Sequence, residues 1–142
     1  MAYLLDASAL YPLVLKLREG FLLHAREFVV LDLTVYEVGN VLWKEYRVGR
    51  ITSLDVVLAL FQEVFRVLRK LSINSLAKVL GVAVNLNLTF YDAAYLYAAR
   101  ENRLTLVTED RKLLGKAQEA GVKAVTVETL AKHLSKGRVK QP

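Results

Sequence analysis

Four acidic residues are the side chains of this sequence whose types and positions could do chemistry. Asp6 and Asp110 each follow a short apolar run, and Glu37 and Asp92 each fall in the first turn of a predicted helix. Clustered carboxylates repel one another and raise each other's pKa values, so they are stable together only beside cations. Oxygen ligands suit hard ions such as Mg²⁺ or Mn²⁺, which activate water for an in-line displacement at phosphorus. The set therefore predicts a metal site that acts on a phosphate ester.

Each acid also has a simpler explanation as a helix cap. Residues 34–37 and 89–92 both begin with Thr and end with an acid, which is the form of a capping box. Asp6 and Asp110 stand where N-cap residues are expected, and acids in first turns also complement the helix dipole. Taken singly, each acid is better explained as a cap. The metal site gains support only if the fold brings at least three of them into one crevice.

The elements that must position these acids alternate along the chain. Strands are predicted at 2–5, 28–31, 104–107 and 123–127, with a possible very short one at 71–73. Helices are predicted at 7–17 with a continuation to 26, and at 34–48, 53–68, 75–85, 89–100, 110–120 and from 128 onward. Short apolar strands separated by helices indicate parallel βαβ units with both sheet faces covered. The predicted fold class is α/β, a three-layer α/β/α domain.

Ligands of such sheets bind outside the carboxyl ends of the strands. Asp6 and Asp110 end strands, and Glu37 opens the helix after a strand, so these three are expected at that edge. Asp92 opens the helix that leads into the strand at 104–107. A simple crossover is expected to place Asp92 at the opposite edge. Asp92 can join the other three acids only if the first turn of its helix packs across the crevice. The sequence pattern does not decide whether it does.

Composition limits the possible functions further. The 142 residues predict one domain, which we place at 1–134, followed by a basic C-terminal tail at 135–142. There are no cysteines and only two histidines, which excludes disulfides, thiolate metal sites and multi-histidine sites. The net charge of +6 favours phosphate backbones as partners. With no leader pattern and no apolar run long enough for a bilayer, we expect a soluble cytoplasmic protein without membrane contact.

Four segments together match one family pattern. They read LLDASAL at 4–10, VYEVGNVL at 35–42, TFYDAAYL at 89–96 and LVTEDRKLL at 106–114. In order, spacing and total length the chain resembles the PIN-domain nucleases, and in particular their toxin members, the VapC ribonucleases. Any one of these segments is a weak signal. Four of them in order, on matching elements and over nearly the whole chain, are a strong one.

The resemblance implies a PIN-like fold, a parallel sheet of about five strands whose helices bring all four acids together. It implies a metal-dependent endoribonuclease that uses Mg²⁺ or Mn²⁺ to cleave RNA, forms a homodimer and is neutralised by a small cognate antitoxin of the VapB type. By position, the catalytic and metal-binding set is Asp6, Glu37, Asp92 and Asp110. The supporting polar residues are Ser8 and Thr108, which are expected to bond carboxylates or a metal-bound water, and Asn40, which could orient Glu37.

Other functions stay open. A phosphoacceptor signalling domain needs a second acid beside Asp6 and a Lys after a late strand, and neither is present; haloacid-dehalogenase-like phosphatases need an acid where Ser8 stands. A non-catalytic RNA-binding or assembly module, in which the acids are only caps, predicts no effect of metal. An RNA-processing PIN nuclease that is not a toxin is a variant of the main hypothesis.

The remaining aromatic and charged residues carry weaker expectations. Tyr91, Tyr95 and Tyr97 could stack on bases, but their spacing favours core and dimer-interface positions, and Trp43 is also expected in the core. Glu109 is expected to point to solvent. The basic residues of the central helices form either an RNA or partner surface or a solvated face; they are Arg47, Arg50, Arg66, Arg69 and Lys70.

Overall fold

The centre of the protein is a five-stranded sheet in which all neighbouring strands are parallel. A computed structural model describes residues 2–139. The strand order is β3-β2-β1-β4-β5, with the strands at Tyr3–Leu5 (β1), Phe28–Leu31 (β2), Arg69–Leu71 (β3), Thr105–Val107 (β4) and Ala124–Val125 (β5). The predicted parallel sheet of five strands is confirmed. The ambiguous strand exists, two residues earlier than the sequence pattern indicated.

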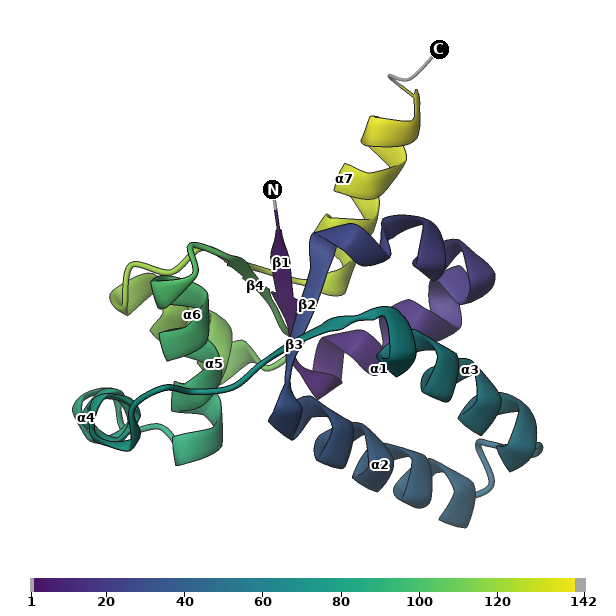
Figure 1. Cartoon of the computed structure of the whole chain (residues 1–142), viewed down its shortest axis with the longest axis horizontal. Helices are drawn as coiled ribbons and strands as arrows, with labels where there is room; N and C mark the ends of the chain where they lie inside the picture. The colour runs from purple at the N-terminus through teal and green to yellow at the C-terminus, as the bar shows by residue number, and fades with distance from the viewer. Residues whose placement is uncertain (1, 140–142) are drawn as a thin grey trace.

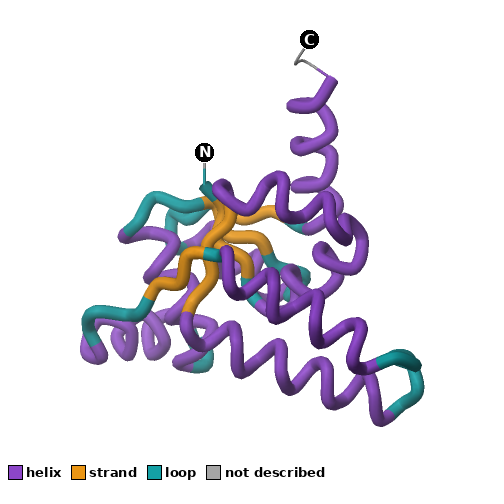
Figure 2. The backbone as a smooth tube through the Cα atoms, turned by 45° about the vertical axis from the view of Figure 1, so that its right-hand side comes forward, coloured by secondary structure: helices purple, strands orange, loops and turns teal. Residues whose placement is uncertain are grey.

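Helices cover both faces of the sheet, as Figures 1 and 2 show. One layer consists of α1 (Ala7–Leu17), the 3-10 segment η1 (Arg18–Glu27), α2 (Asp32–Arg47), α3 (Leu54–Val67) and α7 (Val127–Val139). The other consists of α4 (Leu76–Leu86), α5 (Phe90–Glu101) and α6 (Arg111–Glu119). The predicted three-layer α/β/α arrangement is therefore confirmed.

The strands read as continuous apolar runs because both of their faces are buried. Successive side chains point to opposite faces, so Leu5 and Val30 join the core beneath α1 and α3, while Leu4, Val29 and Leu106 join the core beneath α5. Each of these side chains is at most 3% exposed. Two separate cores thus hold the sheet edge rigidly in place, and the acids are attached to that edge.

The helix starts differ from the predicted ones at α2. This helix begins at Asp32 rather than Thr34, and the Thr34 hydroxyl accepts the backbone N–H of Leu31 at 3.1 Å. Thr34 therefore lies inside the first turn and Glu37 lies in the second, so the capping box expected at 34–37 is wrong. At α5 the cap is as expected, with the Thr89 hydroxyl accepting the N–H of Asp92 at 3.2 Å.

The expectation that a simple crossover would place Asp92 at the opposite edge is also wrong. The strands β1 and β4 are parallel, so the helix that leads into β4 must run back against the strand direction and start at their carboxyl edge. Helix α4 precedes α5 and is bent from it by 110°. In Figure 1, α5 starts at the end of the sheet where α1 and α2 also start.

The C-terminal segment extends the last helix. Helix α7 continues to Val139, so residues 135–139 of the expected tail are helical, and residues 140–142 lie outside the described part of the chain. The boundary at 134 stays a prediction. Within residues 2–139 no single helix is long and apolar enough to cross a membrane; only α4 and α5 together reach that length and composition, as a pair bent by 110°.

Candidate active site

Asp6 is the buried centre of the site. It follows β1, is 7% exposed and caps α1, with its Oδ1 accepting the N–H of Ala9 at 3.0 Å. The Ser8 hydroxyl donates to the same oxygen at 2.6 Å, and the Thr108 hydroxyl donates to Oδ2 at 2.5 Å. Ser8 and Thr108, expected as polar supports, thus both contact Asp6. One carboxylate joins the loop after β1 to the loop after β4.

The same network reaches Asp110 through Thr108. The Thr108 hydroxyl accepts the N–H of Asp110 at 3.1 Å, and the Asp110 carboxylate caps α6 by accepting the N–H of Leu113 at 3.1 Å. Capping therefore uses one oxygen of Asp110, and its side chain is otherwise exposed at the sheet edge. Asp6 and Asp110 act as caps, as their positions predicted, and they also lie at the edge where a ligand would bind.

Glu37 is held by a residue that the sequence analysis assigned only to the core. The hydroxyl of Tyr95 donates to Glu37 Oε1 at 2.5 Å and lies 2.7 Å from the Thr34 hydroxyl. Tyr95 and Thr34 are both buried, and Glu37 is partly buried. Tyr95 lies one turn after Asp92 on α5, so this bond ties α2 to the helix that carries the third acid. No pattern in the sequence pairs residues 37 and 95.

The four acids form one electrostatic group. Burial raises the pKa of Asp6, hydrogen bonds from Ser8, Thr108 and Ala9 oppose this, and the charge of Asp92 raises it further. Burial also raises the pKa of Glu37, against the Tyr95 hydrogen bond and with the charges of Asp6 and Asp92 adding to the rise. Each of these carboxylates is therefore less easily ionised than a free one, chiefly because it is buried and in addition because it faces other carboxylates.

Asp92 links the group to its fourth member. Burial raises the pKa of Asp92, and the charge of Asp110 raises it further, while a hydrogen bond with Thr89 and the nearby Lys112 lower it. Burial and the bond to Glu37 likewise raise the pKa of Tyr95, which keeps its hydroxyl a donor. A positive charge placed among these carboxylates would relieve their repulsion.

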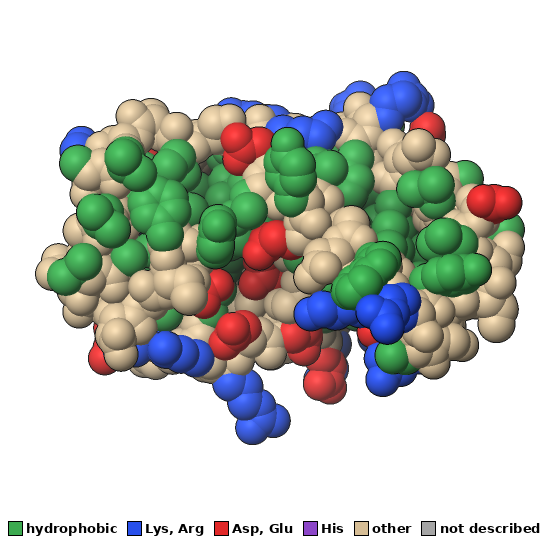
Figure 3. All heavy atoms as spheres, turned by 90° about the horizontal axis from the view of Figure 1, so that it is seen from below, with side chains coloured by type: hydrophobic (Ala, Val, Ile, Leu, Met, Phe, Trp, Pro, Cys, Tyr) green, Lys and Arg blue, Asp and Glu red, His purple; other side chains and the backbone are tan. Residues whose placement is uncertain are grey.

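Figure 3 looks at this edge of the molecule and shows acidic side chains gathered along the middle of the face. Across residues 2–139, however, no three acidic or histidine side chains lie close enough together, as they stand, to hold a metal ion. The donor set nevertheless has the chemistry of a site for Mg²⁺ or Mn²⁺, since all its atoms are carboxylate oxygens at one edge. Coordination of one ion by three of them requires side-chain rotation.

Three other polar side chains make no hydrogen bond to the four acids among the described residues. Asn40 is exposed, and no hydrogen bond joins it to Glu37 among the contacts of the described chain; Tyr95 orients Glu37 instead. Asp32 accepts the N–H of Leu33 and the hydroxyl of Ser72, away from the four acids. Glu109 does not simply point to solvent, because its carboxylate accepts the N–H of Val127 at 2.6 Å, at the start of α7.

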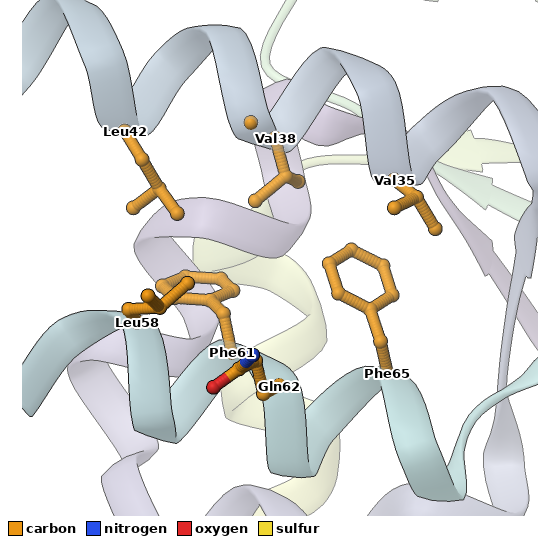
Figure 4. Close-up of a pocket in the computed structure, with 8 residues that line it drawn as sticks. Val35, Val38, Leu42, Leu58, Phe61, Gln62 and Phe65 are labelled. Carbon is orange, nitrogen blue, oxygen red and sulfur yellow. The ribbon is translucent and has the colours of Figure 1, made fainter. Parts of the chain in front are cut away.

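An apolar groove lies beside the site, between α2 and α3. Its cavity has a volume of about 310 Å³. The side chains in Figure 4 point into it from both helices: Val35, Val38 and Leu42 from α2, and Leu58, Phe61, Gln62 and Phe65 from α3. Gln62 is the one polar side chain among them, so this groove carries no acid–base or metal chemistry.

With this geometry in hand, the comparisons with known proteins identify the class. The model of the PIN domain family matches residues 3–132. The chain therefore belongs to the PIN-domain family, and the predicted resemblance to that family is confirmed.

Within the family, the similarity is to VapC-type members. The chain is 43% identical over 133 residues to Exonuclease VapC9 of Pyrobaculum aerophilum, covering 94% of this chain and 96% of that protein. It is 34% identical over 125 residues to Ribonuclease VapC3 of the same organism, covering 82% of this chain and 95% of the relative. The crystal structure of PAE2754 from Pyrobaculum aerophilum has a TM-score of 0.82 to this chain at 42% identity, covering 96% of this chain and 98% of the other.

Proposed function

We propose that this protein is a metal-dependent endoribonuclease of the cytoplasm, and that it is the toxin of a VapBC-type pair. The observation that carries the proposal is the electrostatic coupling of four carboxylates from separate elements at one edge of the sheet, with raised pKa values at three of them. The net charge of +6 supports a polyanionic substrate. The names of two similar proteins, an exonuclease and a ribonuclease, support nuclease activity.

The proposed metal ligands are the four acids themselves. Mg²⁺ is commonly held by one or two carboxylates together with waters and substrate phosphates, so it does not need three converging side chains. Such an ion, when bound, activates water and stabilises the negative charge that develops at phosphorus. The proposed acid set, catalytic and metal-binding, is Asp6, Glu37, Asp92 and Asp110.

The other residues of the site hold these acids in position. Ser8 and Thr108 fix both oxygens of Asp6, and Tyr95 fixes one oxygen of Glu37. Asp92 and Asp110 are the more accessible pair and face the incoming phosphate, with Lys112 beside them as a cation for the backbone. Attack by water breaks the P–O3′ bond, so the products carry a 5′-phosphate and a 3′-hydroxyl.

A circular single-stranded RNA tests this proposal directly. An endonuclease cuts a circle, whereas an exonuclease has no end to start from, which matters because the relative at 43% identity is named an exonuclease. We expect cleavage in Mg²⁺ or Mn²⁺, none in EDTA, and none with Asp92→Asn. The matched control is Asp55→Asn, an exposed acid in the first turn of α3. Cleavage of linear RNA alone would exclude the endonuclease, and metal-independent binding without cleavage would favour the non-catalytic RNA-binding alternative.

The proposed protein partners are a VapB-like antitoxin and a second copy of this chain. The antitoxin follows from the similarity to VapC-type proteins. A homodimer is supported by an apolar row on α4, where Leu76, Leu80 and Val84 recur every four residues and are 70%, 51% and 72% exposed. Light scattering of the wild type and of Leu80→Asp tests this. The wild type should have the mass of a dimer, and Leu80→Asp, which places a charge in the apolar row on α4, should have the mass of a monomer.

A further inference from the structure

We propose that the exposed face of α2 binds the unpaired bases of an RNA strand and leads that strand to the acidic edge. This inference rests on the proposed RNA-cleaving function. Tyr36, Asn40, Trp43 and Arg47 follow one another at intervals of four, three and four residues, which places them on one helix face. All four are exposed, Tyr36 by 79% and Trp43 by 54%, although Trp43 was expected in the core. We call these four residues the stacking row.

The stacking row starts beside the acids. Tyr36 directly precedes Glu37 and points outward. The Glu37 side chain, one residue further along the helix, points toward Tyr95 instead. A second exposed tyrosine, Tyr91, stands in the same relation to Asp92 on α5 and is 59% exposed. Aromatic faces from two separate helices therefore flank the carboxylates. A base on either side of a cleaved phosphodiester would meet one of them.

The far end of the row combines an aromatic ring with cations. The guanidinium of Arg47 lies over the ring of Trp43, 4.9 Å from its centroid. Both line a hollow of about 310 Å³ together with Lys44, Glu45, Val48 and Arg50. Arg50 bonds both oxygens of Glu45, whereas Lys44 and Arg47 have no ion pair among the described side chains. Figure 3 shows basic and apolar side chains lying together over α2.

This chemistry favours single-stranded nucleic acid. Unpaired bases stack on aromatic rings and on guanidinium planes, and nearby cations bind their phosphates, whereas a duplex keeps its base faces covered. A helical protein partner would prefer the apolar groove between α2 and α3, to which Val38 and Leu42 contribute from another face of α2. From Glu37 to Trp43 is six residues, or about 9 Å along the helix, the length of about three stacked nucleotides.

Trp43 reports on this binding directly, because it is the single tryptophan of the chain. The protein is titrated in EDTA with a single-stranded RNA of about ten nucleotides, and Trp43 fluorescence is followed. We expect saturable quenching. The same RNA as a duplex and inorganic polyphosphate should leave the fluorescence nearly unchanged, because neither offers an unpaired base.

Affinity variants separate stacking from charge. With a labelled RNA followed by anisotropy, Trp43→Ala should raise Kd at least about fivefold, and Trp43→Phe should keep most of the affinity. The control is Lys123→Ala, an exposed cation directly before β5, where Kd should change by less than about twofold at constant salt.

Several results would overturn the inference: no quenching by single-stranded RNA, equal quenching by the duplex or by polyphosphate, or an unchanged Kd in Trp43→Ala. Quenching by a purified antitoxin chain but not by RNA would assign the row to a protein partner instead. Because EDTA removes any cleavage, the two proposals fail separately. A protein that binds RNA through Trp43 but never cuts it contradicts the nuclease, and one that cuts RNA without using Trp43 contradicts this inference alone.

Discussion

Removal of one hydroxyl, in Tyr95→Phe, tests how the site is supported. That group donates to Glu37 at 2.5 Å and lies 2.7 Å from the Thr34 hydroxyl, and phenylalanine fills the same space without it. A hydrogen bond to a charged group contributes about 1.5–3 kcal/mol and a neutral one about 0.5–1.5 kcal/mol. Because Glu37 is only partly buried, water replaces some of its lost bond. We therefore expect the free energy of unfolding to fall by about 2–3 kcal/mol.

Urea unfolding near neutral pH and at about pH 4 measures this loss. The loss should be smaller at the lower pH, where the Glu37 carboxyl is protonated and no longer a charged acceptor. For a chain of this length, the neutral-pH loss corresponds to a fall in Tm of about 6–12 °C. Without the Tyr95 donor, the raised pKa of Glu37 should rise further, so metal binding should need a higher pH than in the wild type.

Tyr97→Phe is the matched control. Tyr97 lies on the same helix, but its hydroxyl donates to the amide oxygen of Asn74 at 2.9 Å and lies near Glu101 rather than near any of the four acids of the site. Its loss should be clearly smaller and should leave the pH dependence of metal binding unchanged. The proposed support of Glu37 is refuted if the unfolding free energy of Tyr95→Phe lies within about 0.5 kcal/mol of the wild-type value. It is also refuted if the variant loses the same unfolding free energy at both pH values.

Two further predictions follow from the same contacts. In metal-free protein, the raised pKa values of Asp6, Glu37 and Asp92 mean that the folded state binds more protons than the unfolded chain above about pH 4, so the free energy of unfolding falls as pH rises. Urea unfolding from about pH 4 to 8 measures this fall, and Asp92→Asn should make it less steep. An unchanged dependence of the unfolding free energy on pH would contradict the raised pKa of Asp92. Thr108→Val removes a buried hydroxyl that donates to Asp6 and accepts from the backbone N–H of Asp110. Urea unfolding should show a fall in the unfolding free energy of about 1.5–3 kcal/mol. A fall of less than about 0.5 kcal/mol would show that the bond to Asp6 does not stabilise the fold.

The layers and the identity of the acids could be predicted from the sequence. Runs such as 28–31 are apolar at every position because both sheet faces are covered, and this pattern indicates a parallel sheet. Asp6 and Asp110 follow such runs directly, so their place at the sheet edge follows from the topology. The place of Asp92 at that edge follows from the same topology, since a helix that enters a parallel strand directly starts at the carboxyl end, although the crossover expectation wrongly put Asp92 at the opposite edge.

The partners of the acids could not be predicted in the same way. The bond between Tyr95 and Glu37 joins residues 58 positions apart, and it forms only because the fold brings the starts of α2 and α5, from opposite layers, together at the sheet edge. The true start of α2 depends on the Thr34 hydroxyl accepting from Leu31, which competes with its expected role as N-cap. Trp43 is exposed because the buried stripe of α2 is narrow: Val38 and Leu42 are buried, and Trp43 lies on the opposite side of the helix.

Uptake of Mn²⁺ by the purified protein is the most direct test of the acidic site. Free Mn²⁺ has a strong paramagnetic resonance signal that bound Mn²⁺ loses, so a titration gives the stoichiometry and Kd without any RNA. We predict saturable uptake by the wild type and by Asp55→Asn, and at least a tenfold weaker Kd, about 1.4 kcal/mol, for Asp92→Asn. No uptake by the wild type, or equal uptake by Asp92→Asn, would contradict the convergence of these acids on a metal ion.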